Sequence, residues 1–155
     1  MAERSAGTAR EMNAEMTARL LAGPPQPLEE GGLALRVLHV PGRRSGRPQR
    51  TPLGVTRLDG HDYLVSPEPG RDWVRNVEAA GGCELLAGGT RDARRAVRAS
   101  GAEAARAVAR YLANTRAPWV LSRFPVPAGA TPEEVEPHLA ALAVFRLEPG
   151  SGGGR

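Results

Sequence analysis

Alternating apolar and polar residues predict about six β-strands along this chain. In residues 33–40, Leu33, Leu35 and Val37 alternate with smaller or charged residues. Side chains of a strand point alternately to its two faces, so this spacing is typical of a strand. Similar runs predict further strands at residues 51–58, 61–66, 83–87, 91–99 and 143–147.

Apolar residues at helical spacing predict helices before and after these strands. Met12, Met16 and Leu20 lie at i, i+4 and i+8, so they share one face of a helix. That helix is expected over residues 8–22, after a loose start, with Thr8 as its N-cap. Further helices are expected at residues 72–80, with Asp72 as N-cap and Gly81-Gly82 at the end, and at residues 102–114. After a segment broken by prolines, 117–130, Thr131 is expected to cap another helix in a capping box with Glu134.

The turns between the predicted strands indicate an antiparallel sheet. Asp59-Gly60 and Gly88-Gly89 are turn sequences that join neighbouring strands in hairpins. About six antiparallel strands remove their exposed edges by closing into a barrel. We therefore predict a mainly β chain with flanking helices, of the α+β class. Its expected parts are an N-terminal helix and linker at 1–32, an antiparallel barrel domain at 33–149 and a disordered tail at 150–155.

Composition limits the kinds of partner that this chain could have. Its 155 residues carry a net charge of +4, and 41% of them are hydrophobic, which is enough for the core of one domain. All 21 basic residues are arginines, whose planar guanidinium groups suit phosphate and carboxylate oxygens. The single Cys83 excludes an internal disulfide. We find no signal sequence and no apolar run that could span a bilayer, so we expect a cytoplasmic protein without stable membrane insertion.

Four arginines lie close together between the first two predicted strands. Residues 42–50, which we name the arginine loop, read Gly-Arg-Arg-Ser-Gly-Arg-Pro-Gln-Arg. Glycines let a backbone turn its N–H groups toward a ligand, and arginine forks hold phosphate or carboxylate oxygens in pairs. The loop therefore suits a small molecule with several negative charges. On charge alone, a nucleic-acid backbone or a solvated basic hairpin remains open.

A second candidate segment joins the third predicted strand to the helix at 72–80. The strand ends at Ser66, and Trp73 and Asn76 lie three residues apart on one face of the helix. The N-terminus of a helix offers unpaired N–H groups and a partial positive charge to an anion. The plainer interpretation is a tryptophan packed on the barrel beside a solvated Asn76.

Taken together, these two segments resemble the deazaflavin-dependent nitroreductase family of actinobacteria. That family has a Gly-Arg-(Arg/Lys)-(Ser/Thr)-Gly loop followed by Thr-Pro-Leu, and later a Trp-x-x-Asn helix, which correspond to residues 42–46, 51–53 and 73–76. The resemblance extends in matching order from about Leu35 to Leu147. It implies a split β-barrel similar to FMN-binding oxidoreductases. It also implies coenzyme F420, whose tail carries a phosphate and an oligoglutamate chain, with FMN as the alternative cofactor.

The resemblance also implies cofactor contacts for particular residues of this chain. The phosphate would be bound by Arg43, Arg44, Ser45 and Gly46, and the tail carboxylates by Arg50. The ring system would be bordered by Thr51, Pro52 and Leu53, its reactive edge by Val65 and Ser66, and its far side by Trp73 and Asn76.

The expected reaction is a hydride transfer between the reduced deazaflavin and an electron-poor small molecule, such as a quinone, an enone or a nitro compound. The cofactor would supply the redox chemistry, and Ser66 is the nearest candidate for a catalytic hydroxyl. No Ser-His-Asp set and no metal-binding spacing is visible in the sequence. The substrate pocket is expected to be lined by Met16, Tyr63, Tyr111, Trp119 and Phe124.

Two other functions remain open from the sequence. A non-redox or lyase-like member of the same fold would keep the pocket but lose the cofactor. A nucleic-acid-binding protein could use the arginine loop, but no aromatic side chain lies between the arginines to stack on bases, so we expect no nucleic-acid partner. A small-molecule substrate is the expected partner, and the chain is expected to be a monomer or a homodimer.

Overall fold

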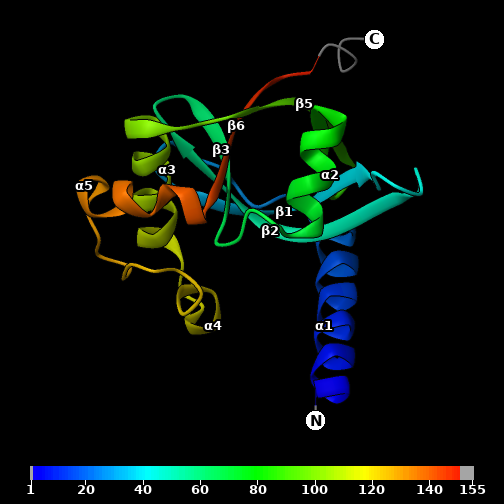
Figure 1. Cartoon of the computed structure of the whole chain (residues 1–155). Coiled ribbons are helices and arrows are strands. Elements are labelled where there is room, and N and C mark those ends of the chain that lie inside the picture. The colour runs from blue at the N-terminus through cyan, green and yellow to red at the C-terminus, as the bar shows by residue number, and fades with distance from the viewer. Residues whose placement is uncertain (1, 151–155) are drawn as a thin grey trace.

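The computed structural model describes residues 2–150 and forms a closed barrel of six antiparallel strands (Figure 1). Around the barrel the strands follow the order β1-β2-β3-β6-β5-β4. Their bounds are β1 (Leu33–Pro41), β2 (Pro48–Leu58), β3 (His61–Ser66), β4 (Gly82–Ala87), β5 (Thr90–Arg98) and β6 (Ala143–Pro149). The strands and the antiparallel barrel expected from the alternating pattern are confirmed. The tail at 151–155, expected to be disordered, lies outside the described residues.

Turn geometry and strand pairing set the register of the barrel. Asp59 and Gly60 between β2 and β3 have positive φ angles of 54° and 77°, which match the twist of a tight hairpin. β1 pairs with β2 along its whole length. β3, in contrast, pairs with β2 only at residues 56–58. Residues 48–55 of β2 therefore have no second strand partner within the described part of the chain, and we name them the free edge of β2.

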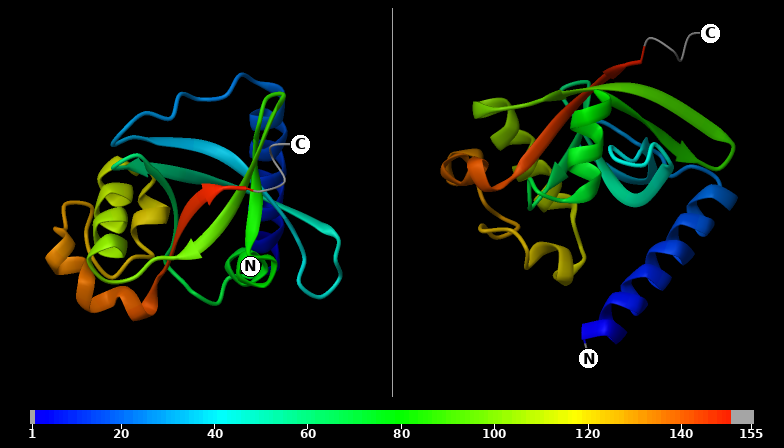
Figure 2. Two further views of the ribbon diagram at one scale, coloured as in Figure 1. Left: turned by 90° about the horizontal axis from the view of Figure 1, so that it is seen from above. Right: turned by 45° about the vertical axis from the view of Figure 1, so that its right-hand side comes forward.

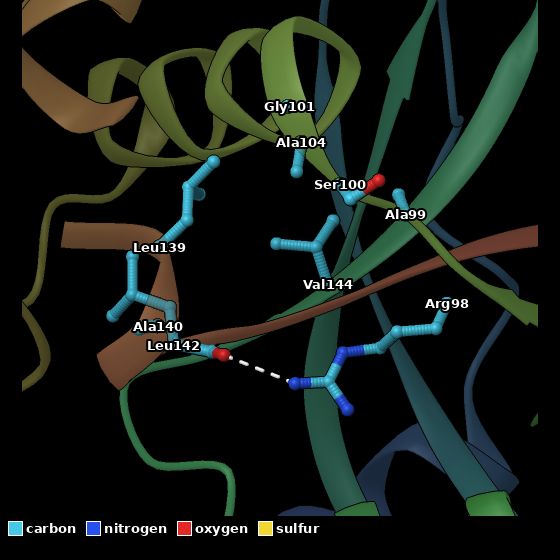
Figure 3. A pocket seen from close by; sticks show the side chains of 9 residues that line it. All are labelled: Arg98, Ala99, Ser100, Gly101, Ala104, Leu139, Ala140, Leu142 and Val144. Carbon is cyan, nitrogen blue, oxygen red and sulfur yellow. Dashed lines mark hydrogen bonds between the residues drawn. The ribbon is translucent and has the colours of Figure 1, made fainter. Parts of the chain in front are cut away.

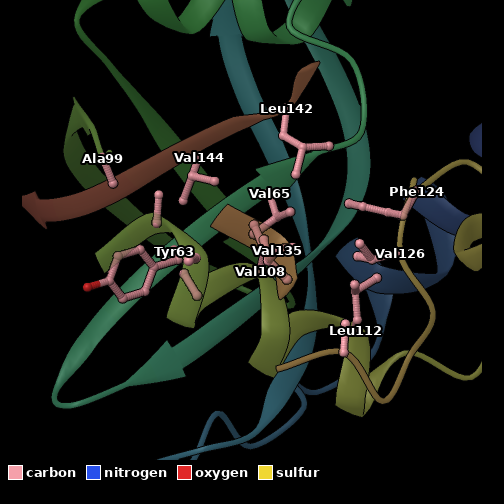
Figure 4. Close-up of a cluster of buried hydrophobic side chains, with 14 residues drawn as sticks. Tyr63, Val65, Ala99, Val108, Leu112, Phe124, Val126, Val135, Leu142 and Val144 are labelled. Carbon is pink, nitrogen blue, oxygen red and sulfur yellow. The ribbon is translucent and has the colours of Figure 1, made fainter. Parts of the chain in front are cut away.

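Two apolar cores stabilise this arrangement. The first fills the barrel and is covered by α2 (Asp72–Ala80), which contributes the fully buried Val74 and Val77. The second lies between the outside of the barrel and α3 (Gly101–Asn114), and Figure 4 shows Val108 of this helix within it. Burying such a side chain contributes about 1.5–3 kcal/mol.

The N-terminal helix extends away from the barrel. Near the C-terminal end of α1 (Ala2–Ala22), the N–H of Gly88 donates a hydrogen bond of 2.8 Å to the carbonyl of Leu20. The rest of the helix points away from the body of the molecule (Figure 2). The helix already begins at Ala2, so the expected loose start is wrong for the described residues, and Thr8 lies inside the helix instead of capping it. Met12 on its apolar face is 58% exposed.

α2 follows the predicted bounds and differs at its cap. Arg71 is the N-cap residue, and Asp72 is the first helical residue, so the expected cap at Asp72 is wrong by one position. No side chain caps this helix start. At the other end, Gly81 adopts a φ of 74° and terminates the helix, as predicted.

The C-terminal part contains short helices before the last strand. α4 (Pro118–Leu121) is a single turn inside the proline-broken segment. Thr131 caps α5 (Pro132–Val135) in a capping box with Glu134, which confirms the prediction. The chain then tightens into the 3₁₀ helix η1 (Glu136–Ala141), where the sequence pattern predicted a continuous helix.

A buried ionic cluster lies at the start of β3, at the opposite end of that strand from Ser66. Asp62 is 3% exposed and accepts hydrogen bonds of 2.8 Å from Arg57 Nε and from Arg94 Nη2. We name these three residues the Asp62 cluster. The arginine loop lies at the other end of β2, so the Asp62 cluster is separated from it by the length of that strand.

Candidate functional site

The arginine loop is folded into a closed turn. The N–H of Gly46 donates to the carbonyl of Gly42 at 2.9 Å, and the N–H of Gly42 donates to the carbonyl of Arg47 at 2.8 Å. The Ser45 hydroxyl accepts the N–H of Arg47 at 3.1 Å. Gly46 has a φ of 75°, which residues with side chains rarely adopt. These bonds give the turn a defined shape of its own.

Arg43 connects this turn to α2. Its backbone N–H and its Nη1 both donate to Oδ1 of Asn76, at 3.0 and 2.9 Å. Its Nη2 also lies 3.3 Å from Oδ1 of Asp72 at the start of the helix. Asn76 is 4% exposed, so the plainer interpretation of a solvated Asn76 is wrong. The two segments that the sequence singled out are therefore in direct contact.

Other polar groups of the turn remain available to a ligand. Within the described residues, the backbone amides of Arg44 and Ser45 have no hydrogen-bond acceptor. The side chains of Arg44 and Arg47 are exposed, and neither forms a salt bridge with a described residue. Adjacent unpaired amides in a turn form a concave site for an anion, and guanidinium groups strengthen it.

Arg50 follows the turn and is oriented by a histidine. Its Nε donates to Nδ1 of His39 at 3.2 Å. Burial, and secondly the charge of Arg50, lower the pKa of His39, which keeps its ring neutral and able to accept this bond. The terminal nitrogens of Arg50 have no acceptor among the described residues, so they stay open to a carboxylate.

The free edge of β2 continues from the loop. Thr51, Pro52 and Leu53 are half-buried along it. Trp73 of α2 is also half-buried, and its ring centroid lies 6.3 Å from that of Phe145. The tryptophan therefore packs on the barrel core, as the plainer interpretation of this residue held.

Ser66 does not present a free hydroxyl. Its side chain is fully buried, and its hydroxyl donates to the carbonyl of Glu68 at 2.8 Å and accepts the N–H of Glu68 at 3.2 Å. These bonds hold the hydroxyl in the turn after β3, which argues against the expected catalytic role. Val65 is 7% exposed and belongs to the core beside α3, so its side chain is directed away from a cofactor surface.

The residues expected around the substrate do not form one pocket. Tyr63 and Phe124 are buried at opposite ends of the cluster drawn in Figure 4. Tyr111 packs against Phe124, with ring centroids 5.7 Å apart. Trp119 is 68% exposed on α4, and Met16 lies on the projecting α1. The expectation of a single pocket lined by these five residues is wrong.

Cavities of the molecule lie away from the arginine loop. An apolar cavity of about 310 Å³ lies between α3, η1 and β6, with Ala104, Leu139 and Val144 in its wall (Figure 3). A larger cavity of about 850 Å³, with a more polar wall, lies beside Asp62. Neither is lined by the arginine loop or by α2. The candidate site is the surface formed by the loop, α2 and the free edge of β2.

Comparison with known proteins identifies the family of this chain. Residues 9–120 match the sequence profile of the F420H2-dependent quinone reductase family. The chain belongs to this family. The matched range includes the arginine loop and α2, the two segments that resemble deazaflavin-dependent nitroreductases.

One of the similar solved structures superposes well enough to show the same fold. A structure described as a domain-swapped dimer superposes with a TM-score of 0.53 at 17% identity, covering 95% of this chain and 98% of that chain. A structure of an F420-H2-dependent reductase (FDR-A) has a TM-score of 0.47 at 16% identity, covering 79% of this chain and 99% of that chain. A further F420 reductase has a TM-score of 0.41 at 13% identity, covering 86% and 92%. None of the curated proteins matches this chain.

As a member of the F420H2-dependent quinone reductase family, this chain is an oxidoreductase that uses coenzyme F420 to reduce quinone-like small molecules. The cofactor, the enzyme class and the fold expected from the sequence are thereby confirmed. The donor groups of the arginine loop fit the phosphate and carboxylates of this cofactor. Within residues 2–150, no helix has the length and apolar character needed to cross a bilayer.

The sequence interpretation missed two features of this surface. Arg43 and Asn76 bind each other, although both were expected to bind the cofactor. Arg47 was not among the expected contacts, yet its side chain is exposed beside the free amides. The glycines at both ends of the turn were a visible signal for its shape, whereas nothing in the sequence marks a contact between residues 33 positions apart.

Proposed function

We propose that the arginine loop binds the phosphate of coenzyme F420 through the amides of Arg44 and Ser45 and the guanidinium groups of Arg44 and Arg47. The observation that carries this proposal is a pair of adjacent amides without an acceptor, in a turn whose shape is already fixed. Donors that need no rearrangement lose little conformational entropy when the anion binds. Gly46 closes the turn at a φ of 75°, which residues with side chains rarely adopt.

The remaining contacts follow from the position of this turn. Arg50 binds carboxylates of the tail, because His39 orients its side chain and its terminal nitrogens have no described acceptor. Thr51, Pro52 and Leu53 on the free edge of β2 border the ring system, where β3 leaves that edge uncovered. Trp73 of α2 borders the opposite side of the ring system.

The reaction needs little acid–base chemistry from the protein. Bound in its reduced form, coenzyme F420 supplies the hydride that reduces an electron-poor acceptor. The residues of the site bind and orient, and we assign the accompanying proton to water because Glu68 engages the Ser66 hydroxyl. Besides quinones, electron-poor enones and nitro compounds are candidate acceptors, since they accept a hydride in the same way.

The assembly state and the cytoplasmic location of this chain stay predictions. Its similarity to a structure described as a domain-swapped dimer supports a homodimer over a monomer. α1 extends from the body of the molecule and is an element that two copies can exchange (Figure 2).

Titration by the fluorescence of purified coenzyme F420 tests the phosphate site. Arg44→Ala should lower the affinity about ten- to a hundredfold, since a hydrogen bond to a charged group contributes about 1.5–3 kcal/mol. High salt should weaken wild-type binding, because these contacts are largely ionic. Arg110→Ala removes an exposed arginine of α3 outside the site and should bind like the wild type. Equal affinities of Arg44→Ala and the wild type would contradict this placement of the phosphate.

A further inference from the structure

We propose that Asn76 is a positioning residue that holds the arginine loop in its binding shape through Arg43. This inference rests on the function proposed for the loop. It also changes the role of Arg43, which becomes a link between the turn and α2 instead of a ligand of the phosphate.

The acceptor oxygen of Asn76 is already fully used. A carbonyl oxygen has two lone pairs, and Oδ1 of Asn76 accepts two bonds, one from the Arg43 N–H and one from its guanidinium. The residue is 4% exposed, and its neighbours Val74 and Val77 on α2 are fully buried in the barrel core. Asn76 therefore offers the loop an anchor on a helix that is packed on the barrel core.

This anchor acts on the peptide that begins the turn. Residues 43–45 form one turn, closed by the bond from Gly46 to Gly42, so fixing the direction of the Arg43 amide also fixes the next two amides. Those two amides, of Arg44 and Ser45, are the free donors. Asp72 also contacts Arg43, but its side chain is 87% exposed and such surface pairs contribute little. Asn76 is therefore the main anchor.

Hydrogen exchange of the cofactor-free protein tests the anchor independently of coenzyme F420. In Asn76→Ala, the amides of Arg43 and Gly46 should exchange about tenfold faster, which is the effect of losing about one hydrogen bond. Asn76→Asp keeps an oxygen at the accepting position and should restore slow exchange. If these amides exchange in Asn76→Ala at the same rate as in the wild type, the proposal is overturned. If they exchange faster while Asn76→Ala unfolds at the same temperature as the wild type, the change is local to the turn.

Cofactor titration of single and double variants then separates positioning from direct contact. Asn76→Ala should raise the Kd and the KM for coenzyme F420 about tenfold while kcat at saturating cofactor is retained. The double variant Asn76→Ala with Arg43→Ala should bind like Asn76→Ala alone, because Arg43 acts through the same anchor. Effects that multiply in the double variant would show that Arg43 contacts the cofactor directly and would overturn the proposal.

The two proposals fail in different ways. If Arg44→Ala binds coenzyme F420 normally, the function proposed for the loop fails, while the exchange experiment still reports on the anchor. If Arg44→Ala weakens binding but Asn76→Ala leaves both exchange and affinity unchanged, only the positioning role of Asn76 fails.

Discussion

Asp62 of β3 is a buried carboxylate whose charge is stabilised by Arg57 of β2 and Arg94 of β5. Burial alone would raise the pKa of Asp62, but hydrogen bonds from Arg57 and Arg94 outweigh it and lower the pKa below its ordinary value of 3.8. Glu103 of α3 has a pKa lowered in the same way, by hydrogen bonds from Arg146 and Tyr63. Both carboxylates therefore favour the folded state in their charged form.

The stability of the fold should decrease as the pH falls below about 4. For a group with a lowered pKa in the folded state, the contribution is present above the pKa of the unfolded chain and is lost as the pH falls through the folded-state pKa. Thermal unfolding from about pH 7 to about pH 3 measures this loss. Asp62→Asn should destabilise the protein at neutral pH by about 3–5 kcal/mol, because two arginines lose a buried partner. A constant unfolding temperature across this range would contradict the account.

Contacts between single residues could be predicted only when they are local in the chain. The capping box of Thr131 and Glu134 was predicted because both partners lie within one helical turn. The sequence did not predict the bond from Arg43 to Asn76 or the burial of Ser66. Both depend on how α2 and the turn after β3 pack on the barrel. The residue types of the site are thus visible in the sequence, but their partners are set by tertiary structure.

At the scale of elements, α1 meets the barrel at a crowded turn. Gly88 between β4 and β5 has a φ of 55°, and a Cβ at this position would lie 2.7 Å from the carbonyl oxygen of Gly23. The glycine therefore allows the end of α1 to approach the hairpin closely enough for the bond between Gly88 and Leu20.

Gly88→Ala should loosen α1 from the barrel. A side chain at a positive φ costs about 1–2 kcal/mol, and the contact with Gly23 adds to this cost. Trypsin should therefore release the segment that ends at Arg19 about fivefold faster or more. Mass spectrometry of the early fragments measures this rate. Gly89→Ala is the matched control, because a Cβ there meets no atom within 4 Å. Identical rates for the two variants would mean that this turn does not seat α1.

The elements themselves could be predicted where a simple periodicity defines them. Strands with an alternating sequence pattern, such as β1, and hairpins with glycine turns appear at almost the predicted bounds, although burial along β1 does not alternate strictly. The start of α1 could not be predicted from Thr8, because the preceding residues include alanine, glutamate and arginine, which themselves favour a helix. The start of α1 was therefore misplaced because the capping signal at Thr8 competes with the helix preference of the residues before it, and not because of a long-range contact.

On the scale of the whole molecule, the Asp62 cluster and the surface proposed to bind the cofactor lie at different ends of the barrel. The Asp62 cluster lies where β2 ends and β3 begins, whereas the arginine loop precedes the other end of β2. The closed barrel could be predicted from the number of antiparallel strands. The position of the proposed site could not be predicted, because it depends on β3 pairing with β2 only at residues 56–58.

This separation predicts independent effects of substitutions at the two ends. Arg94→Gln should lower the unfolding temperature with little change in the affinity for coenzyme F420, and Arg44→Ala should do the reverse. In the double variant the two effects should add, because the sites share no contacts. Calorimetry and fluorescence titration of the same preparations measure both quantities, and a loss of affinity in folded Arg94→Gln would show that the ends are coupled.

The uncovered stretch of β2 also bears on how the protein avoids aggregation. An unpaired strand edge can recruit a strand of another chain and begin fibril growth. Pro48 and Pro52 lack the N–H groups that such growth requires, and Arg50 between them adds a charge that repels an identical copy. The same stretch that we propose borders a flat ring is therefore a poor template for the addition of a strand from another copy.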